Sequence, residues 1–279
     1  MDTTRSGASP LNHVLIEIGY CCDDPPLQLK PTLSQAKSKH GPVMLKLLDK
    51  TSDELRILEA LNRIKSESNH VIHVLDSFHL DIGTVIVLPI ASSLDSHRFT
   101  SSFVALDFMN QLTRAVAFIH ANGVAHLDLK PDNILVSCMA DQPRLLMIDF
   151  DVSVFVDSPD TQIEGFVGTP PWVAPEVGTE HGPLQSYSPI RADLWACGRL
   201  LLYIASQYYV RDPTLLQLAR DLSSDDPLRR PLLHEQSRDH LTKKERHSIP
   251  HHLEMPLAKC MCTEALRTDP FQSNMKTIV

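Results

Sequence analysis

The chain has 279 residues, of which 43% are hydrophobic and 22% are charged, a composition typical of a globular protein with enough chain to bury a substantial core. Its formal net charge of −8 argues against nucleic acid as a main partner. No apolar run is long enough to cross a bilayer, and the first seven residues lack the apolar centre of a signal peptide. These features favour an intracellular protein, in the cytoplasm, with no membrane partner.

Short apolar runs predict a strand-rich region within the first ninety residues. Residues 42–48 form one such run, with Lys46 inside it. Residues 71–75 and 84–89 form two more, and residues 81–83 between them have turn character. Ser52 is a typical helix-start residue, and the apolar positions 55, 58 and 61 follow it at helical spacing.

A longer helix is predicted before residue 123. Apolar side chains recur there at steps of three and four residues, the period of one helix face, and Gly123 is a typical residue just beyond a helix end. The stripe is core packing rather than a cofactor site, and it comprises Phe103, Leu106, Met109, Leu112, Val116 and Ile119.

Residues 126–133, His-Leu-Asp-Leu-Lys-Pro-Asp-Asn, carry the strongest chemical signal. Phosphoryl transfer needs a carboxylate to orient the attacking hydroxyl, a cation to hold the phosphate and an oxygen ligand for Mg²⁺. Asp128, Lys130 and Asn133 supply all three from one short loop. The simpler interpretation, a polar surface turn rich in Asp, Asn and Pro, is disfavoured because every required polar group is present.

A second carboxylate follows a predicted buried strand. The apolar residues 145–148 lead into Asp149, Phe150 and Asp151. Taken alone, Asp149 is more often an acid at a strand end than a metal ligand. Its short distance in sequence from Asn133 favours the metal ligand.

The loop pattern His-x-Asp-x-Lys-x-x-Asn closely resembles the catalytic loop of protein kinases. Residues 168–176, Gly-Thr-Pro-Pro-Trp-Val-Ala-Pro-Glu, resemble the end of the kinase activation segment. The resemblance implies that Asp128 is the base, that Lys130 binds the γ-phosphate of ATP, and that Asn133 and Asp149 hold Mg²⁺. It also implies a structural role for His126.

The same resemblance implies an α+β bilobal fold. We expect a small β-rich lobe over residues 1–90, a larger and mainly helical lobe over residues 91–235, and a polar tail over residues 236–279. In the small lobe, Lys46 would bind the α- and β-phosphates, and Glu54 would pair with it; Glu59 is the competing residue. Leu88 would be the gatekeeper and Ile90 would begin the hinge.

Further roles follow from the kinase resemblance in the large lobe. Thr169 would bond near Asp128 and Lys130, as in Ser/Thr-specific kinases. Glu176 would form a structural ion pair with Arg230. Asp193, on a predicted central helix, would brace the catalytic-loop backbone.

The chain also departs from the kinase pattern. The region that corresponds to the Gly-rich phosphate loop, residues 16–26, has a single glycine, although close approach of backbone to phosphate favours glycine. Asp151 stands where the family has a glycine, which removes backbone freedom at positive φ, and Leu127 stands where it has an arginine that pairs with a phosphorylated activation segment. The large lobe is short between residues 206 and 215, where a substrate-binding helix usually lies.

We therefore predict a Ser/Thr protein kinase that uses Mg-ATP on protein hydroxyls. The missing glycines, Asp151 and Leu127 support an alternative, a pseudokinase that acts as a nucleotide-binding or scaffold module. A kinase-like enzyme for a small molecule is a third possibility. The Cys260-x-Cys262 pair is a weak metal signal, and reduced incidental thiols are favoured. Nothing in the sequence indicates the substrate identity or the oligomeric state.

Overall fold

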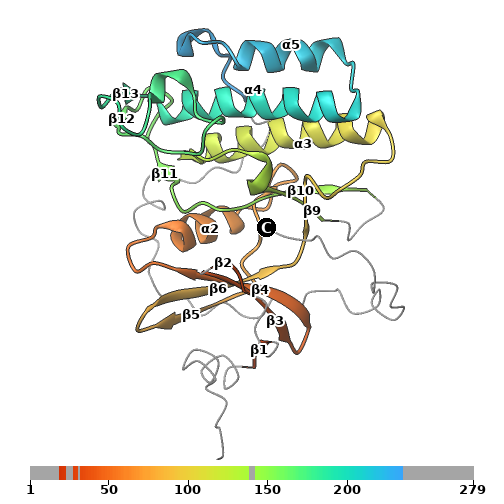
Figure 1. The fold of residues 1–279 in the computed structure, drawn as a ribbon, viewed down its shortest axis with the longest axis vertical. Coiled ribbons are helices and arrows are strands. Elements are labelled where there is room, and N and C mark those ends of the chain that lie inside the picture. Colours follow the sequence, from red (N-terminus) through yellow and green to blue (C-terminus); the bar gives the residue numbers. More distant parts are fainter. Residues whose placement is uncertain (1–18, 23–27, 31, 138–141, 235–279) are drawn as a thin grey trace, which may run out of the picture. The chain divides into compact units, whose positions relative to one another are not determined.

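The computed structural model describes residues 19–22, 28–30, 32–137 and 142–234. These residues divide into two compact units: the chain up to Lys50 with Val74–Ile90, and Thr51–His73 with the chain from Ala91 onward. The predicted α+β class is confirmed, because in the described ranges strands make up the first unit, and helices with short strands make up the second (Figure 1). Residues 51–73, which the prediction placed in the small lobe, group with the second unit. The predicted tail lies outside the described residues.

The first unit is an antiparallel sheet with the strand order β1-β3-β4-β6-β5, and β2 pairs with β3. The strands predicted over residues 42–48 and 84–89 are confirmed as β4 and β6. The bounds are β1 Cys21–Cys22, β2 Gln28–Lys30, β3 Leu33–Ser38, β4 Gly41–Leu48, β5 Asp76–Leu80 and β6 Gly83–Pro89.

The strand predicted over residues 71–75 is wrong. Val71 forms only an isolated bridge to Met147, and Ile72 N–H donates to Met147 O at 2.9 Å. The start of this apolar run thus bonds to β10, whereas Leu75 N–H donates to Val87 O of β6 at 2.8 Å. The strand that pairs with β6 is the following segment, β5.

The turn predicted at residues 81–83 is confirmed and depends on Gly83. Its φ is +150°, and a Cβ placed there would lie 2.2 Å from the Leu48 carbonyl oxygen. Any other residue would clash with the neighbouring strand, so Gly83 fixes the β5–β6 hairpin against β4.

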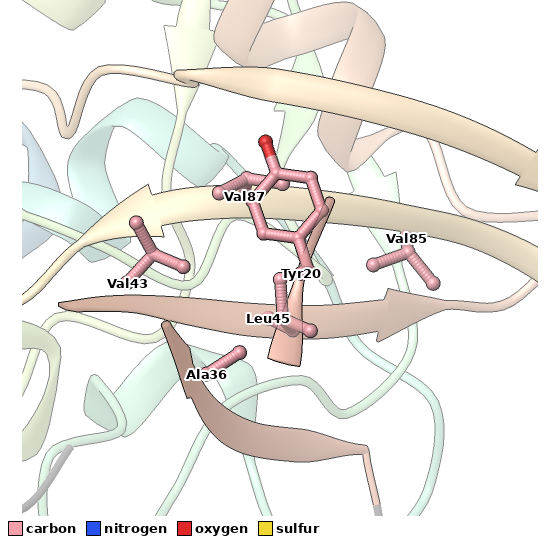
Figure 2. Packing of buried hydrophobic residues seen from close by; sticks show 6 residues of the cluster. All are labelled: Tyr20, Ala36, Val43, Leu45, Val85 and Val87. Atoms are coloured by element: carbon pink, nitrogen blue, oxygen red, sulfur yellow. The ribbon is translucent and has the colours of Figure 1, made fainter. Parts of the chain in front are cut away.

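The two faces of this sheet differ. Directly opposed residues of paired strands share a face, so Lys46 lies with its partners Leu33 and Ile86 on one face. The other face carries a cluster of buried apolar side chains that includes Tyr20 (Figure 2). The Tyr20 ring lies edge-on to Phe78, and its hydroxyl donates to Asp76 Oδ2 at 3.1 Å. Lys46 therefore lies on the face opposite the apolar cluster, whose members in Figure 2 are Tyr20, Ala36, Val43, Leu45, Val85 and Val87.

The helices that the structure describes in the second unit are α2 Glu54–Asn62, α3 Ser102–Ala121, α4 Pro189–Tyr208 and α5 Pro213–Leu222. Helix α4 packs against both α3 and α5 (Figure 1). Within the described ranges, no helix combines the length and the apolar character that a membrane span needs. The short strands are β7 Ser92–Ser93, β8 Val124–Ala125, β9 Ile134–Ser137, β10 Arg144–Met147, β11 Val154–Phe155, β12 Ile163–Glu164 and β13 Ser186–Tyr187, and the 3₁₀ turns are η1 Pro131–Asn133, η2 Pro175–Val177 and η3 Pro227–Arg229.

Helix α3 confirms the predicted helix before residue 123. Ser101 caps it by accepting from Val104 N–H at 3.3 Å, and Gly123 follows its end with φ +66°. The predicted stripe is wrong at Phe103, which is 76% exposed. At about 100° per residue, Phe103 lies about 120° around the helix from the buried Met109, so it faces solvent.

His70 predicts a pH dependence of stability. Its side chain is buried with Nδ1 3.2 Å from Leu145 O, and burial, followed by the charge of Arg144, lowers its pKa to about 4. The unfolded chain takes up a proton near pH 6.5 while the folded chain stays neutral, so we expect the unfolding free energy to fall by roughly 3 kcal/mol from pH 6.5 to pH 4. Chemical denaturation across this range should show the loss, and His70→Asn, which keeps a donor near Nδ1, should flatten it. An equal slope in that variant would contradict the assignment.

Candidate active site

One carboxylate on α4 binds the backbone of residues 126–127, directly before Asp128. Asp193 is 1% exposed and accepts from His126 N–H at 2.6 Å and from Leu127 N–H at 2.7 Å. His120, from α3, places Nε2 3.0 Å from the same carboxylate. The bracing contact expected for Asp193 is therefore present, and it fixes the loop backbone just before Asp128.

His126 connects the loop to the segment that carries Asp149. Its Nδ1 accepts from Asp128 N–H at 3.2 Å, so the proton resides on Nε2, which donates to Ile148 O at 2.9 Å. The ring also packs on Phe150, with the centroids 4.7 Å apart. The His126 side chain therefore fixes the position of the Asp128 segment relative to the Asp149 segment.

The polar groups of residues 128–133 converge. Lys130 Nζ donates to Asp128 Oδ2 at 2.7 Å and to Thr169 Oγ1 at 2.8 Å. Asn133 Nδ2 donates to the same Oδ2 at 3.0 Å and to Asp128 O at 2.8 Å. Among the described residues, the buried Asp128 Oδ1 finds no hydrogen-bond partner. An oriented carboxylate oxygen with a vacant acceptor position can receive a proton from a substrate hydroxyl.

Helix α2 meets the Asp149 segment through Glu54. This carboxylate is 1% exposed, and its Oε1 accepts from Phe150 N–H at 3.3 Å. The competing Glu59 instead places its Oε2 3.9 Å from an Arg63 nitrogen, one helix turn along α2. Glu54 thus contacts the backbone of the segment that carries Asp149.

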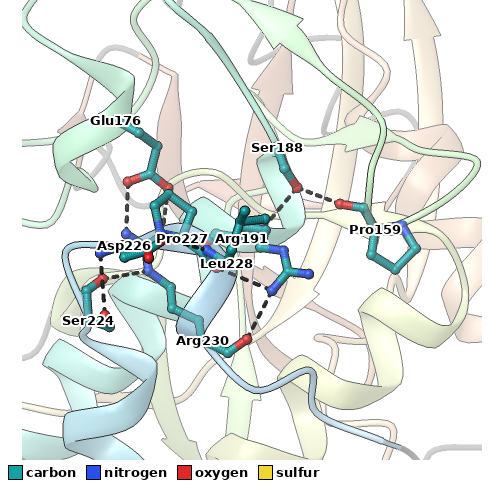
Figure 3. A network of polar contacts seen from close by, with 9 residues as sticks. All are labelled: Pro159, Glu176, Ser188, Arg191, Ser224, Asp226, Pro227, Leu228 and Arg230. Carbon is teal, nitrogen blue, oxygen red and sulfur yellow. Dashed lines mark hydrogen bonds and ion pairs between the residues drawn. The ribbon is translucent and has the colours of Figure 1, made fainter.

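A buried ion pair joins η2 to the chain after η3. Arg230 has a fully buried side chain and binds the Glu176 carboxylate with both terminal nitrogens, one at 2.9 Å (Figure 3). The guanidinium also donates to Ser224 O and Arg191 O, each at 2.8 Å. The ion pair that the resemblance implied is present, and it anchors the end of the segment that contains Thr169.

The model of the protein kinase domain matches residues 33–248, which is well over half of the chain. The chain belongs to the protein kinase family.

Curated kinases are similar over a shorter part. The chain is 38% identical over 122 residues to CBL-interacting serine/threonine-protein kinase 15 of Arabidopsis thaliana, a match that covers 43% of this chain and 27% of that protein. It is 39% identical over 118 residues to CBL-interacting protein kinase 19 of Oryza sativa subsp. japonica, with 41% and 22% covered. The matches thus span about a quarter of the length of these relatives.

Within the kinase fold, Leu127 occupies the arginine position as a buried residue with a left-handed backbone conformation. It is 8% exposed and has φ +66°. A Cβ at Gly168 would lie 2.8 Å from the Leu127 carbonyl oxygen, so only glycine allows the activation segment to approach this closely. An apolar and buried side chain here cannot pair with a phosphate.

The departure at Asp151 also has a local explanation. Among the described residues, the positive φ in this segment belongs to Asp149, at +68°, and Asp151 has none. The backbone freedom of the family's glycine is therefore not used in this conformation. Instead, the Asp151 carboxylate accepts from Ser52 Oγ at 3.1 Å.

The remaining predicted kinase residues lie in the first unit. Lys46 is half-buried in β4, and Leu88, 7% exposed, lies opposite Met44 on the same sheet face. Ile90 directly follows β6. Most of the degenerate Gly-rich region, residues 16–26, lies outside the described residues. The short connection predicted in the large lobe is confirmed, because α4 ends at Tyr208 and α5 begins at Pro213.

Sequence reasoning missed three positioning groups. His120 bonds to Asp193, Ser153 Oγ donates to His126 O at 3.0 Å, and Ser52 bonds to Asp151. Each contact joins segments distant in the chain and uses a common polar residue. The sequence marked one of these residues, Ser52, but only as a helix-start residue, and its Oγ does accept from Glu54 N–H at 3.2 Å.

Proposed function

We propose that the chain is an ATP-dependent Ser/Thr protein kinase. The observation that carries the proposal is the Asp128 carboxylate, whose Oδ2 is held by Lys130 and Asn133 while its buried Oδ1 has no partner among the described residues. In the proposed step, the substrate oxygen bonds to the γ-phosphorus while the bond to the ADP oxygen breaks. Asp128 orients the hydroxyl and accepts its proton.

Two residues suit the magnesium that the family uses. Asn133 donates through Nδ2 to Asp128, so its amide oxygen can serve as a ligand, and Asp149 adds a carboxylate. Such hard oxygen ligands, together with phosphate oxygens and water, are what Mg²⁺ prefers, without an all-protein cage. In the described part, no group of three or more His, Cys, Asp or Glu side chains could hold a metal, which agrees with a site that phosphate completes. Bound Mg²⁺ would neutralise phosphate charge.

The cations have separate proposed roles. Lys130 lies between Asp128 and Thr169, where it would bind the γ-phosphate in the transition state. Lys46, on the sheet face opposite the apolar cluster, would bind the α- and β-phosphates. Leu88 and Ile90 would contact the nucleotide base, as the resemblance implies.

The Lys130–Thr169 bond of 2.8 Å supports Ser/Thr specificity, because it is the contact that the resemblance to Ser/Thr-specific kinases implies. The test is transfer of labelled γ-phosphate from Mg-ATP to three matched basic peptides whose only hydroxyl is on Ser, Thr or Tyr. We expect label in the Ser and Thr peptides and little in the Tyr peptide. Equal labelling of Tyr would contradict the specificity, and no labelling of any peptide would favour the scaffold alternative.

A further inference from the structure

The beginning of α2 is tied to the Asp149 segment by a chain of hydrogen bonds. Ser52 Oγ donates to Asp151 Oδ1 at 3.1 Å and accepts from Glu54 N–H at 3.2 Å. Glu54 Oε1 in turn accepts from Phe150 N–H at 3.3 Å. The four residues form a closed set of contacts between a helix start and the segment that carries the proposed metal ligand Asp149.

A third contact extends this connection along the activation segment. The Arg56 guanidinium lies 4.8 Å from the centre of the Phe155 ring, in β11. Strand β11 pairs with β8, directly before the catalytic loop. Helix α2 is therefore linked through side chains to both ends of residues 149–155.

The arginine that pairs with a phosphorylated activation segment in the family is replaced by Leu127. Leu127 is buried and apolar, so phosphate on the activation segment would find no arginine at this position. Asp151 is the second departure from the family, and it lies in the same segment. The two departures can be related by function, because a built-in bond can hold α2 where a phosphate-dependent contact is lost.

We propose that Asp151 is a positioning residue, whose bond to Ser52 holds α2, and with it Glu54, against the Asp149 segment without phosphorylation of the activation segment. This inference rests on the proposed kinase function. Asp151 touches neither nucleotide nor substrate in the proposal, and it acts through Ser52 and Glu54. In the competing role, as a further ligand for Mg²⁺, Asp151 would use Oδ2 because Oδ1 is bonded to Ser52, and the Mg²⁺ requirement separates the two roles.

The experiment compares wild type with Asp151→Ala, Ser52→Ala, the double variant and Asp151→Asn. Asn keeps a carbonyl acceptor for Ser52 but removes the charge. Ala is preferred to Gly because Gly would add backbone freedom. For each unphosphorylated protein, we would measure kcat and KM for ATP, the Mg²⁺ concentration at half-maximal rate, and amide hydrogen exchange in α2.

We expect Asp151→Ala to lower kcat about 3- to 10-fold, the range for one hydrogen bond, with little change in the Mg²⁺ requirement. The Ser52→Ala loss should not add to it in the double variant, because both remove the same bond. Exchange in α2 should rise in these three variants. The kcat of Asp151→Asn should stay within about 2-fold of wild type, because Asn keeps an acceptor for Ser52. A general loss of stability would not be rescued by Asn in this way.

Two results would overturn the proposal. Unchanged exchange in α2 of Asp151→Ala would show that the bond positions nothing. A raised Mg²⁺ requirement in both Asp151→Ala and Asp151→Asn would assign Asp151 to the metal instead. Failure of the kinase function is distinguishable, because a wild type without transfer activity still reports α2 positioning through hydrogen exchange.

Discussion

Replacing Asp128 with Asn is expected to lower kcat for phosphate transfer by about 10²- to 10⁴-fold, the range for a positioned acid or base. Asn keeps the size and the contact to Lys130, but it cannot accept the hydroxyl proton. Lys130 and Asn133 hold Oδ2, whereas the buried Oδ1 has no hydrogen-bond partner among the described residues and would accept the substrate proton in the proposed step. Initial rates at saturating Mg-ATP measure the effect.

Asp132 supplies the matched control for this change. It lies in the same loop, within η1, and is exposed, so Asp132→Asn makes the identical chemical change away from the Asp128 carboxylate. We expect it to retain kcat within about 3-fold, as surface substitutions usually do. Comparable losses in both variants would indicate a general effect of charge on the loop rather than a base at Asp128.

Truncating Arg230 to Ala is expected to lower the unfolding free energy by about 3–5 kcal/mol, the cost of leaving one partner of a buried ion pair without the other. Arg230 is fully buried and bonds to Glu176, Ser224 O and Arg191 O (Figure 3). Its removal would leave a carboxylate and two carbonyl oxygens unpaired. Denaturant unfolding followed by circular dichroism measures the change.

A paired replacement separates the ion pair from simple packing. Arg230→Met with Glu176→Leu removes both charges, and we expect it to be less destabilising than Arg230→Met alone, because no unpaired buried charge remains. The exposed pair of Arg229 and Asp226, 3.4 Å apart, is the control: Arg229→Ala should cost less than about 1 kcal/mol. A double variant that is no more stable than Arg230→Met would contradict this account of Glu176.

The elements with a local apolar pattern were predictable from the sequence. Helix α3 follows apolar residues at helical spacing, and strands β4 and β6 follow short continuous apolar runs. The errors arose where tertiary contacts decide. Residues 71–75 are apolar enough for a strand, but Val71 and Ile72 bond to Met147 of β10, whereas Leu75 bonds to Val87 of β6. Phe103 fits the stripe in sequence but is exposed at the start of the helix.

The candidate site was predictable where its residues lie in one motif. Residues 126–133 carry Asp128, Lys130 and Asn133 within eight positions, so the motif itself brings them together. The Ser52–Asp151 bond joins residues 99 positions apart, and no local pattern indicates it. Only the fold shows that Asp151, at the position of the family's glycine, contacts the start of α2.

The measurement that tests the central claim most directly is transfer of labelled γ-phosphate from Mg-ATP to the chain itself and to a generic basic protein. Wild type, Asp128→Asn, Asp149→Asn and the Asp132→Asn control would be compared after circular dichroism shows that each is folded. The account predicts incorporation by wild type and the control, and its loss in the other two variants. No incorporation by folded wild type with excess ATP and Mg²⁺ would contradict the kinase function and favour a scaffold.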